Sequence, residues 1–361
     1  IWKVSAMIDV LMPTGGDRLE QTLCFALDGV EHRFLAPDAP LLGRRVLFAL
    51  RTDDGGFDEK TLCLLRRLRL SEGAMEGSIG ALLVDGTCEL YTKQLAQDMV
   101  LAANGAGCLF LGKPAVEGTG SLYNQQILAR RRGITWEETY RVRSRELVER
   151  LRDFQPPRYT RPKLLMLHSS ESGRSSTLWM GRALCERLQD TFQITELSLQ
   201  NGTIHDCRGC SYRTCLHFAE NGSCFYGGAI SETILPAIAQ SDVLLLLCPN
   251  YNDAVSANIT ALFNRLTSLL LQSTLYDKYL FAVVVSGYSG SDLVARQILG
   301  TMCLNKTAIL PPNFCLMETG NDLATVSQKE GIETKLDIFA AHIRHTVSKE
   351  LYLHAGDRSG W

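Results

Sequence analysis

The stretch LLMLHSSESGRSST, which runs from Leu164 to Thr177, joins an apolar segment to a serine-rich loop and the start of a helix. Residues 164–167 are apolar enough for a buried strand, and Met180, Leu184 and Leu188 then recur at helical spacing. Strands that alternate with helices in this way predict a parallel α/β sheet with both faces covered. We predict its later strands at residues 195–199, 243–247, 280–285 and 314–317, and a terminal helix at 336–347.

The serine-rich loop lies where the first strand of this sheet meets the first helix. Backbone N–H groups at a helix N-terminus have no partner within the helix, and the helix dipole is positive there. Hydroxyl groups add donors and Arg174 adds a positive charge, so the loop suits a monoester phosphate. A solvated turn with a serine helix cap is the alternative interpretation. The candidate phosphate ligands are Ser169, Ser170, Ser172, Gly173, Arg174, Ser175, Ser176 and Thr177.

Two more loops follow the third and fourth predicted strands. In an open α/β sheet, ligands lie beyond the carboxyl ends of the strands, where the strand order reverses. With the flavodoxin-like order 2-1-3-4-5, the first and third strands flank that point. Amides, a flat tyrosine and glycines that allow close approach suit an isoalloxazine ring, while a helix start capped by Ser256 is the plainer interpretation of the first loop. The candidate residues are Pro249, Asn250, Tyr251 and Asn252, followed by Ser286, Gly287, Tyr288 and Gly290.

Four cysteines crowd into one short segment with the spacing Cys-x2-Cys-x4-Cys-x8-Cys. Four thiolates that lie close together can hold a [4Fe–4S] cluster or a tetrahedral zinc ion. Without a metal, the same thiols would be free, form a redox-active pair or close a labile disulfide. The spacing leaves iron–sulfur, zinc and no metal open. The candidate metal ligands are Cys207, Cys210, Cys215 and Cys224.

Residues 163–300 resemble the superfamily of NADPH-dependent FMN reductases and iron–sulfur flavoproteins. The resemblance rests on the serine-rich loop at 169–177, the Cys-x-Gly-Cys segment at 207–210, the Pro-x-Tyr loop at 249–251 and Asn264-Arg265. It implies a flavodoxin-like fold in which the first and third loops bind FMN and NAD(P)H supplies a hydride. In iron–sulfur flavoproteins a compact cysteine motif in the same connection holds a cluster.

The first half of the chain is less regular, and the proline-containing segment 153–162 separates it from the second half. We therefore expect an N-terminal domain at 1–152, a linker at 153–162 and an FMN-binding domain at 163–361. Within the first domain, Asp28-Gly29 lies between two apolar runs and predicts a β-hairpin. Buried strands are expected at 44–50, 79–84 and 107–111, a helix at 95–103, and a charged, exposed helix at 140–151.

A weak internal repeat connects the two halves. Residues 81–107 have the layout of 243–269, and residues 118–121 then stand where 286–290 stand in the second half. This predicts a smaller, degenerate flavodoxin-like domain, although any two strand–loop–helix units share some likeness. Residues 51–58 would then match the phosphate loop, and their three aspartates would repel phosphate, so we predict no FMN in the first half. That half could cover the flavin through residues 89–93 and 112–121, or serve as a separate docking domain.

The bulk composition narrows the possible classes. The chain has 361 residues, 45% of them hydrophobic and 21% charged, with a net charge of -2, so it is long enough for two domains. Nothing in this charge balance attracts nucleic acid or an anionic membrane, and the apolar runs are too short to span a bilayer. No secretory signal is visible, so we expect a reducing cytoplasm.

These features together predict a flavin-dependent NAD(P)H oxidoreductase that contains FMN. Its acceptor would be a quinone, a nitro or azo compound, free flavin or a protein. No catalytic base is named, because the cofactor carries the chemistry of hydride transfer. Two alternatives are an iron–sulfur flavoprotein that acts as an electron carrier and a non-enzymatic nucleotide sensor with a zinc site. A homodimer or an internal pseudo-dimer is expected.

Overall fold

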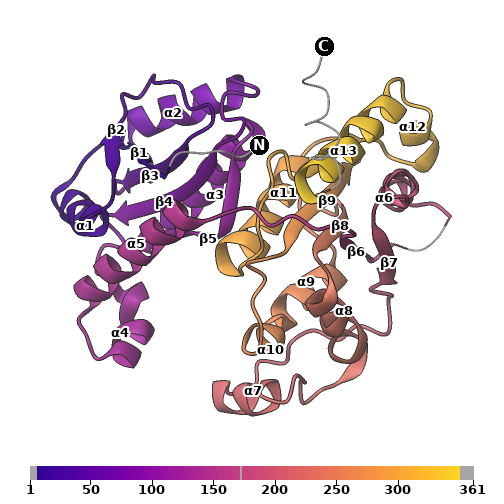
Figure 1. Ribbon diagram of the computed structural model, residues 1–361. Coiled ribbons are helices and arrows are strands. Elements are labelled where there is room, and N and C mark those ends of the chain that lie inside the picture. Colours follow the sequence, from indigo (N-terminus) through magenta and orange to yellow (C-terminus); the bar gives the residue numbers. More distant parts are fainter. Residues whose placement is uncertain (1–5, 171–172, 350–361) are drawn as a thin grey trace. The chain divides into compact units, whose positions relative to one another are not determined.

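The structure, a computed structural model, describes residues 6–170 and 173–349. The chain forms two compact units. The first comprises the chain up to Pro156 together with Leu310–Asn313, and the second comprises Pro157–Ile309 and the chain from Phe314 onward. Each unit has its own five-stranded sheet with helices packed against it (Figure 1).

All neighbouring strands of the second unit are parallel. Their order across the sheet is β7-β6-β8-β9-β10, which in chain order is 2-1-3-4-5, so the flavodoxin-like prediction is confirmed. The two central strands β8 and β9 are buried almost throughout, as expected for a parallel sheet that is covered on both faces. The strands are β6 (Lys163–His168), β7 (Gln193–Ser198), β8 (Val243–Pro249), β9 (Tyr279–Ser286) and β10 (Cys315–Thr319).

The first helix of the second unit, α6, packs directly on this sheet. A Cβ atom at Gly181 would lie 2.4 Å from Leu247 Cδ1, so only glycine lets the helix approach so closely. The helix also packs beside the terminal helix α13. The helices are α6 (Ser176–Leu188), α7 (Tyr212–Ala219), α8 (Leu235–Gln240), α9 (Ala257–Arg265), α10 (Thr267–Leu270), α11 (Ser291–Leu299), α12 (Leu323–Ser327) and α13 (Ile332–Val347), with π-helical turns η2 (Ile230–Ile234) and η3 (Gly300–Asn305).

The first unit repeats this topology. Its strand order is β2-β1-β3-β4-β5, again parallel and again 2-1-3-4-5, so the prediction of a smaller flavodoxin-like domain is confirmed. Helices α1 and α5 pack side by side, as α6 and α13 do in the second unit. The elements are β1 (Ile8–Leu11), α1 (Asp17–Leu27), β2 (His32–Phe34), β3 (Arg45–Thr52), α2 (Glu59–Leu70), β4 (Ile79–Gly86), α3 (Thr92–Gly105), β5 (Leu109–Gly118), η1 (Tyr123–Gln125), α4 (Gln126–Arg132) and α5 (Trp136–Asp153).

The predicted hairpin around Asp28-Gly29 is wrong. The residues before it form α1, whose Leu19, Leu23 and Leu27 are buried at helical spacing, and those after it form β2, which runs parallel to β1. Gly29 has φ 76° and follows the last helical turn. Because a glycine in this conformation ends helices as readily as it turns hairpins, the dipeptide alone does not distinguish the two.

The predicted alignment of the internal repeat is displaced by one strand. The four-residue strand β1 was not foreseen, so Arg45–Thr52 is the third strand of its sheet and Ile79–Gly86 is the fourth. The loop that corresponds to the serine-rich loop is therefore residues 12–16, and the loop with three aspartates follows the third strand instead. The helix at 140–151 was also expected to be exposed, but α5 buries Tyr140, Leu147 and Leu151.

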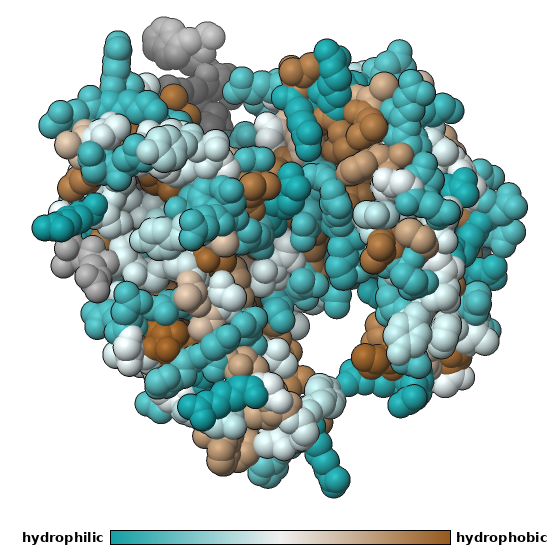
Figure 2. All heavy atoms as spheres, turned by 180° about the vertical axis from the view of Figure 1, so that it is seen from behind, coloured by the Kyte–Doolittle hydropathy of each residue, from teal (hydrophilic) through white to brown (hydrophobic). Residues whose placement is uncertain are grey.

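One face of the surface mixes polar and apolar residues. On the face seen in Figure 2, hydrophobic residues lie singly or in small groups among hydrophilic ones. Scattered apolar side chains of this kind are normal on protein surfaces. Within residues 6–170 and 173–349, no helix combines the length and the apolar character that crossing a bilayer requires.

Candidate functional site at the carboxyl edge of the second sheet

A cleft of about 530 Å³ lies at the carboxyl ends of the second unit's strands. Loops that follow all five strands contribute to its walls, as the topology of an open α/β sheet leads one to expect. It is lined by Ser169, Ser170, Arg174, Ser175, Ser176, Thr177, Asn201, Pro249, Asn250, Tyr251, Val285, Gly287, Gly320 and Asn321.

The N-terminus of α6 forms one end of the cleft and is rich in hydroxyl groups. Ser175 caps the helix, since its Oγ accepts a hydrogen bond from Leu178 N at 3.2 Å, and it also lies 2.9 Å from Thr177 Oγ1. Ser169 Oγ contacts Ser256 Oγ at 2.6 Å, which ties the loop after β6 to the start of α9. Arg174 is the only charged residue among the described residues that line the cleft. Helix dipole, hydroxyls and guanidinium all favour an anion here.

Asn250, which directly follows β8, is fixed by several hydrogen bonds. Its Nδ2 donates to Ser286 Oγ at 3.0 Å and to the Ser289 carbonyl at 2.9 Å, while its backbone N donates to the Val285 carbonyl at 2.9 Å. Its Oδ1 is buried, yet no donor within the described part of the chain lies within hydrogen-bonding distance of it. Buried acceptors are nearly always paired, so this oxygen marks a place where a ligand N–H would bind.

The next residues form a tight turn that presents Tyr251. The backbone N of Tyr251 donates to Ala254 O at 3.1 Å, and Ala254 N donates back at 3.2 Å. Asn252 and Asp253 adopt left-handed conformations with φ 53° and 59°, which is uncommon outside glycine. The turn leaves the Tyr251 side chain 59% exposed beside the cleft. Strained turns of this type are frequent at ligand sites.

The loop after β9 contains two glycines that lie close to side chains of the neighbouring loops. A Cβ at Gly287 would lie 2.5 Å from Asn321 Oδ1, and one at Gly290, where φ is 85°, would lie 2.2 Å from Asp253 Oδ1. Ser286 is buried, and its Oγ lies 2.7 Å from Ser291 Oγ. The loops after β8, β9 and β10 therefore approach one another closely at this end of the cleft.

The structure brings most of the predicted ligand residues together at the cleft. Four others, Gly173, Asn252, Tyr288 and Gly290, belong to the same loops but do not line it; Ser286 supports Asn250 from below the surface; and Ser172 lies outside the described residues. Sequence reasoning missed Asn201 and the Gly320-Asn321 pair. Both follow strands that were predicted, so the rule that ligands lie beyond carboxyl strand ends was the signal available for them.

His168, the last residue of β6, supports the serine-rich loop from below. It is buried, its Nδ1 lies 3.2 Å from the Ser170 carbonyl, and its Nε2 lies 3.3 Å from Glu196 Oε1. Glu196 also pairs with Arg182 at 2.7 Å. Burial lowers the pKa of His168 more than the neighbouring Glu196 raises it. The imidazole thus links the start of the loop to Glu196 on the neighbouring strand β7.

The four clustered cysteines line a small cavity of about 90 Å³, together with Phe218, Phe225 and Tyr226. Burial raises the pKa of the Cys215 thiol, and the three neighbouring thiols raise it further. All four cysteines are free. Within residues 6–170 and 173–349, no group of three His, Cys, Asp or Glu side chains is arranged to hold a metal ion. The thiols therefore gather as predicted, but their arrangement gives the metal prediction no support.

Known proteins resemble the second unit. Residues 162–322, less than half of the chain, match the sequence model of the family described as NADPH-dependent FMN reductase. No curated protein sequence matches significantly. Among solved structures, an azoreductase from Bacillus anthracis is 12% identical with a TM-score of 0.37, and the match covers 50% of this chain and 98% of that chain. An NAD(P)H:quinone oxidoreductase from Methanothermobacter marburgensis is 16% identical with a TM-score of 0.38, covering 51% and 96% respectively.

The family match covers every residue that lines the cleft. The resemblance inferred from the sequence motifs is thereby confirmed for this segment, which is similar in sequence to NADPH-dependent FMN reductases. The donor set fits FMN, because a hydroxyl-rich helix N-terminus suits its phosphate and an unpaired buried amide oxygen suits a ring N–H.

Proposed function

Proceeding from the match of residues 162–322 to the FMN reductase family, we propose that the protein binds FMN in this cleft and uses NAD(P)H to reduce a small, flat acceptor. The observation that carries the proposal is the joining, in one cleft, of the hydroxyl-rich start of α6 with the unpaired Oδ1 of Asn250. When bound, FMN would accept a hydride from NAD(P)H and return electrons to the acceptor.

The chain's own residues bind and orient the cofactor. Ser169, Ser170, Ser175 and Thr177 would donate to the phosphate, and Arg174 would add charge at the open side. Asn250 would accept from a ring N–H while its Nδ2 stays bound to Ser286 and Ser289. None of these residues needs to gain or lose a proton in the reaction.

A flat acceptor suits the outer side of the cleft. Tyr251 lines the cleft and is 59% exposed, and Tyr288 on the neighbouring loop is 86% exposed. Aromatic rings stack on one another with a gain of about 0.5–1.5 kcal/mol beyond simple burial. Quinones and azo compounds present such rings, so we propose them as acceptors ahead of aliphatic compounds.

The test begins with the absorption spectrum of the purified protein and a titration with FMN. We expect bound flavin and NAD(P)H oxidation that depends on an added benzoquinone or azo dye. Replacing Asn250 by Leu should weaken FMN binding by about 10-fold, because one buried hydrogen bond is lost. Gln240→Leu is the matched control, since this amide is exposed at the end of α8 and does not line the cleft. Protein that neither contains flavin nor takes up added FMN would refute the proposal.

A second candidate, an electron carrier, would need a metal cluster at the four clustered cysteines, which line one cavity. As they lie, these thiols do not fit a metal ion, so we derive no electron path through them. Iron and zinc analysis after anoxic purification separates the cases. Stoichiometric iron would favour the electron carrier, and zinc in colourless protein would favour the nucleotide sensor. The absence of both metals would leave the flavin enzyme as the remaining candidate. A cytoplasmic location and a first unit that covers the flavin stay predictions.

A further inference from the structure

The first unit contains the counterpart of the cleft, because both sheets have the same strand order. Arg18 is the second residue of α1, and Thr177, which lines the cleft, is the second residue of α6. The two helices begin after the first strand of their sheets. Arg18 therefore stands at the position that meets the ligand in the second unit, but it carries a long cationic side chain there.

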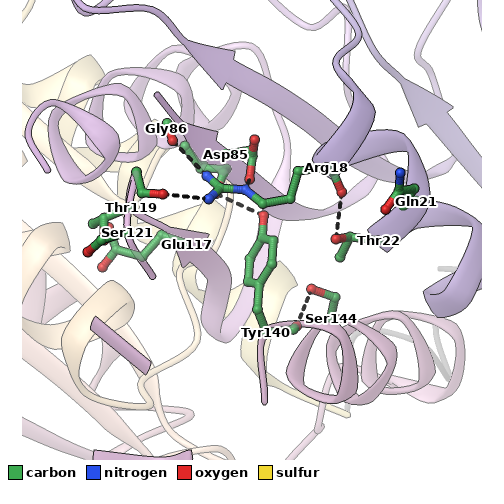
Figure 3. Close-up of polar contacts among 12 residues, drawn as sticks. Arg18, Gln21, Thr22, Asp85, Gly86, Glu117, Thr119, Ser121, Tyr140 and Ser144 are labelled. Carbon is green, nitrogen blue, oxygen red and sulfur yellow. Dashed lines mark hydrogen bonds and ion pairs between the residues drawn. The ribbon is translucent and has the colours of Figure 1, made fainter. Parts of the chain in front are cut away.

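Arg18 reaches across the carboxyl ends of the fourth and fifth strands of its own unit (Figure 3). Its Nε donates to Asp85 Oδ1 at 2.7 Å, its Nη2 to the Gly86 carbonyl at 2.6 Å, and its Nη1 to the Gly120 carbonyl at 2.8 Å. Every nitrogen of the guanidinium thus has an acceptor. A rigid guanidinium fork loses little entropy when it makes several such bonds.

These three acceptors correspond to parts of the second unit's cleft. Asp85 and Gly86 are the last two residues of β4, and their counterparts at the end of β9 are Val285 and Ser286. Gly120 is the second residue after β5. Its counterpart, the second residue after β10, is Asn321. Val285 and Asn321 both line the cleft. The guanidinium therefore lies in the volume that, in the second unit, is open to a ligand.

The surroundings of Arg18 are built to keep it there. The Asp85 side chain is only 8% exposed, and Tyr140 from α5 lies beside it and donates to the Val84 carbonyl at 3.2 Å. Burial raises the pKa of Asp85 although Arg18 acts to lower it. A buried carboxylate is strongly unfavourable without a cationic partner, so loss of Arg18 would leave Asp85 in an unsuitable environment.

The loop before α1 is also poorer in hydroxyl groups than the serine-rich loop. The loop before α1 has five residues against seven in the second unit, and Thr14, its one hydroxyl residue, donates to Asp58 Oδ1 at 2.7 Å. Asp17 and Glu20 occupy the first turn of α1, where a phosphate would otherwise benefit from the helix dipole.

We propose that the first unit keeps the ligand edge of its fold but closes it with its own side chain, so that Arg18 occupies the place of the flavin and each chain binds a single FMN. The stoichiometry rests on the proposed function of the second unit. The closure by Arg18 does not, and it can be tested without flavin.

Chemical rescue tests the closure directly. Arg18→Ala should lower the Tm of the full chain by about 5–10 °C, because it removes the ion pair and the hydrogen bond that the buried Asp85 receives from Arg18. Ethylguanidinium at millimolar concentration should restore part of this loss by entering the vacated volume, whereas ethylammonium, which lacks the fork, should not. Arg130→Ala is the matched control, since Arg130 is an exposed arginine on α4 of the same unit. If Arg18→Ala does not fold, its refolding yield in the presence of ethylguanidinium and of ethylammonium is compared instead.

The outcomes separate the two proposals. An unchanged Tm in Arg18→Ala, or a loss that ethylguanidinium does not reverse any better than ethylammonium, would overturn the closure. FMN titration of the wild-type chain should saturate at one flavin, and a second flavin would overturn it as well. A chain that binds no FMN but shows specific rescue would refute only the function proposed for the second unit.

Discussion

The two units present the same sheet edge with opposite contents. In the second unit, Thr177 and the serines around it leave a cleft of about 530 Å³. In the first unit, Arg18 at the matching position crosses the edge and binds Asp85. The strand order fixes where a ligand can lie, and the side chain at one helix position decides whether a ligand is admitted. Likeness of topology is thus a poor guide to binding unless that position is compared.

The charged residues at the carboxyl edges of the two sheets also differ. Among the described residues that line the cleft of the second unit, Arg174 is the charged one. The loop after β3 in the first unit carries Asp53, Asp54 and Asp58, and Asp58 caps α2 by accepting from Thr61 N at 3.0 Å. The cleft of the second unit is therefore cationic, whereas the closed edge of the first unit carries several carboxylates together with Arg18 and Arg51.

The largest effect is expected from transferring the closing residue. Thr177→Arg gives the second unit the residue that the first unit has at this position. We expect FMN affinity to fall on the order of a thousand-fold, about 4 kcal/mol, because the new side chain fills the volume that the ligand needs. FMN fluorescence quenching during titration measures the change.

Glu186→Arg is the control for this substitution, since Glu186 is an exposed residue on the same helix. It should leave FMN affinity within about 2-fold of the wild type, as expected for a surface change away from the site. Circular dichroism checks that both variants keep the fold. A Thr177→Arg protein that binds FMN within ten-fold of the wild type would break the comparison between the two edges.

An effect of intermediate size on the free energy of unfolding is expected when the glutamate near the end of each fifth strand is replaced. Each ends with a glutamate in the penultimate position, Glu318 in β10 and Glu117 in β5. Burial acts to raise the pKa of Glu318, but hydrogen bonds from Lys329 and Lys335 outweigh it and bring the pKa to about 2. Glu318→Gln should therefore cost about 3 kcal/mol at pH 7. Glu117 pairs with the 70% exposed Lys93, so Glu117→Gln should cost about 1 kcal/mol or less.

The pH dependence gives this prediction its sign. A carboxylate whose pKa is depressed by folding stabilises fully above its unfolded pKa, near 4.3, and loses that contribution as the pH falls toward 2. Urea unfolding of wild type and Glu318→Gln should therefore differ at pH 7 and converge near pH 2. A difference that stays constant with pH would mean that Glu318 acts by packing alone.

The second sheet could be predicted from the sequence because its strands are buried on both faces. Val243–Pro249 and Tyr279–Ser286 are continuous apolar runs, and periodicity alone identifies such segments. In the first unit, β1 is buried but has only four residues, and β2 has three residues, which are all exposed. Neither strand has an apolar pattern long enough to be recognised in the sequence. Missing β1 displaced every later comparison between the halves.

The ligand loops were predictable where turn residues and hydroxyls cluster in the sequence, as at Ser175 and Asn250. Asn201 and Asn321 stand alone in the sequence, and only the sheet brings them to the cleft. The sequence did not indicate a role for Arg18, because a single arginine on an amphipathic helix is usually an exposed surface charge. Its role depends on Asp85 and Gly120, which lie 67 and 102 residues away.

The smallest effect is expected at the last residue of the first strand, where the second unit has His168 and the first unit has the buried Leu11. His168→Leu should weaken FMN binding by about 3- to 10-fold, because it removes one hydrogen bond to the Ser170 carbonyl.

Burial lowers the pKa of His168 in the folded state, so the unfolded state binds a proton more readily. Wild-type stability should therefore decline on going from pH 7 to pH 5, and the leucine variant, which lacks this group, should decline less. Urea unfolding at both pH values measures the difference, and an equal decline in the two proteins would show that His168 is protonated as easily folded as unfolded.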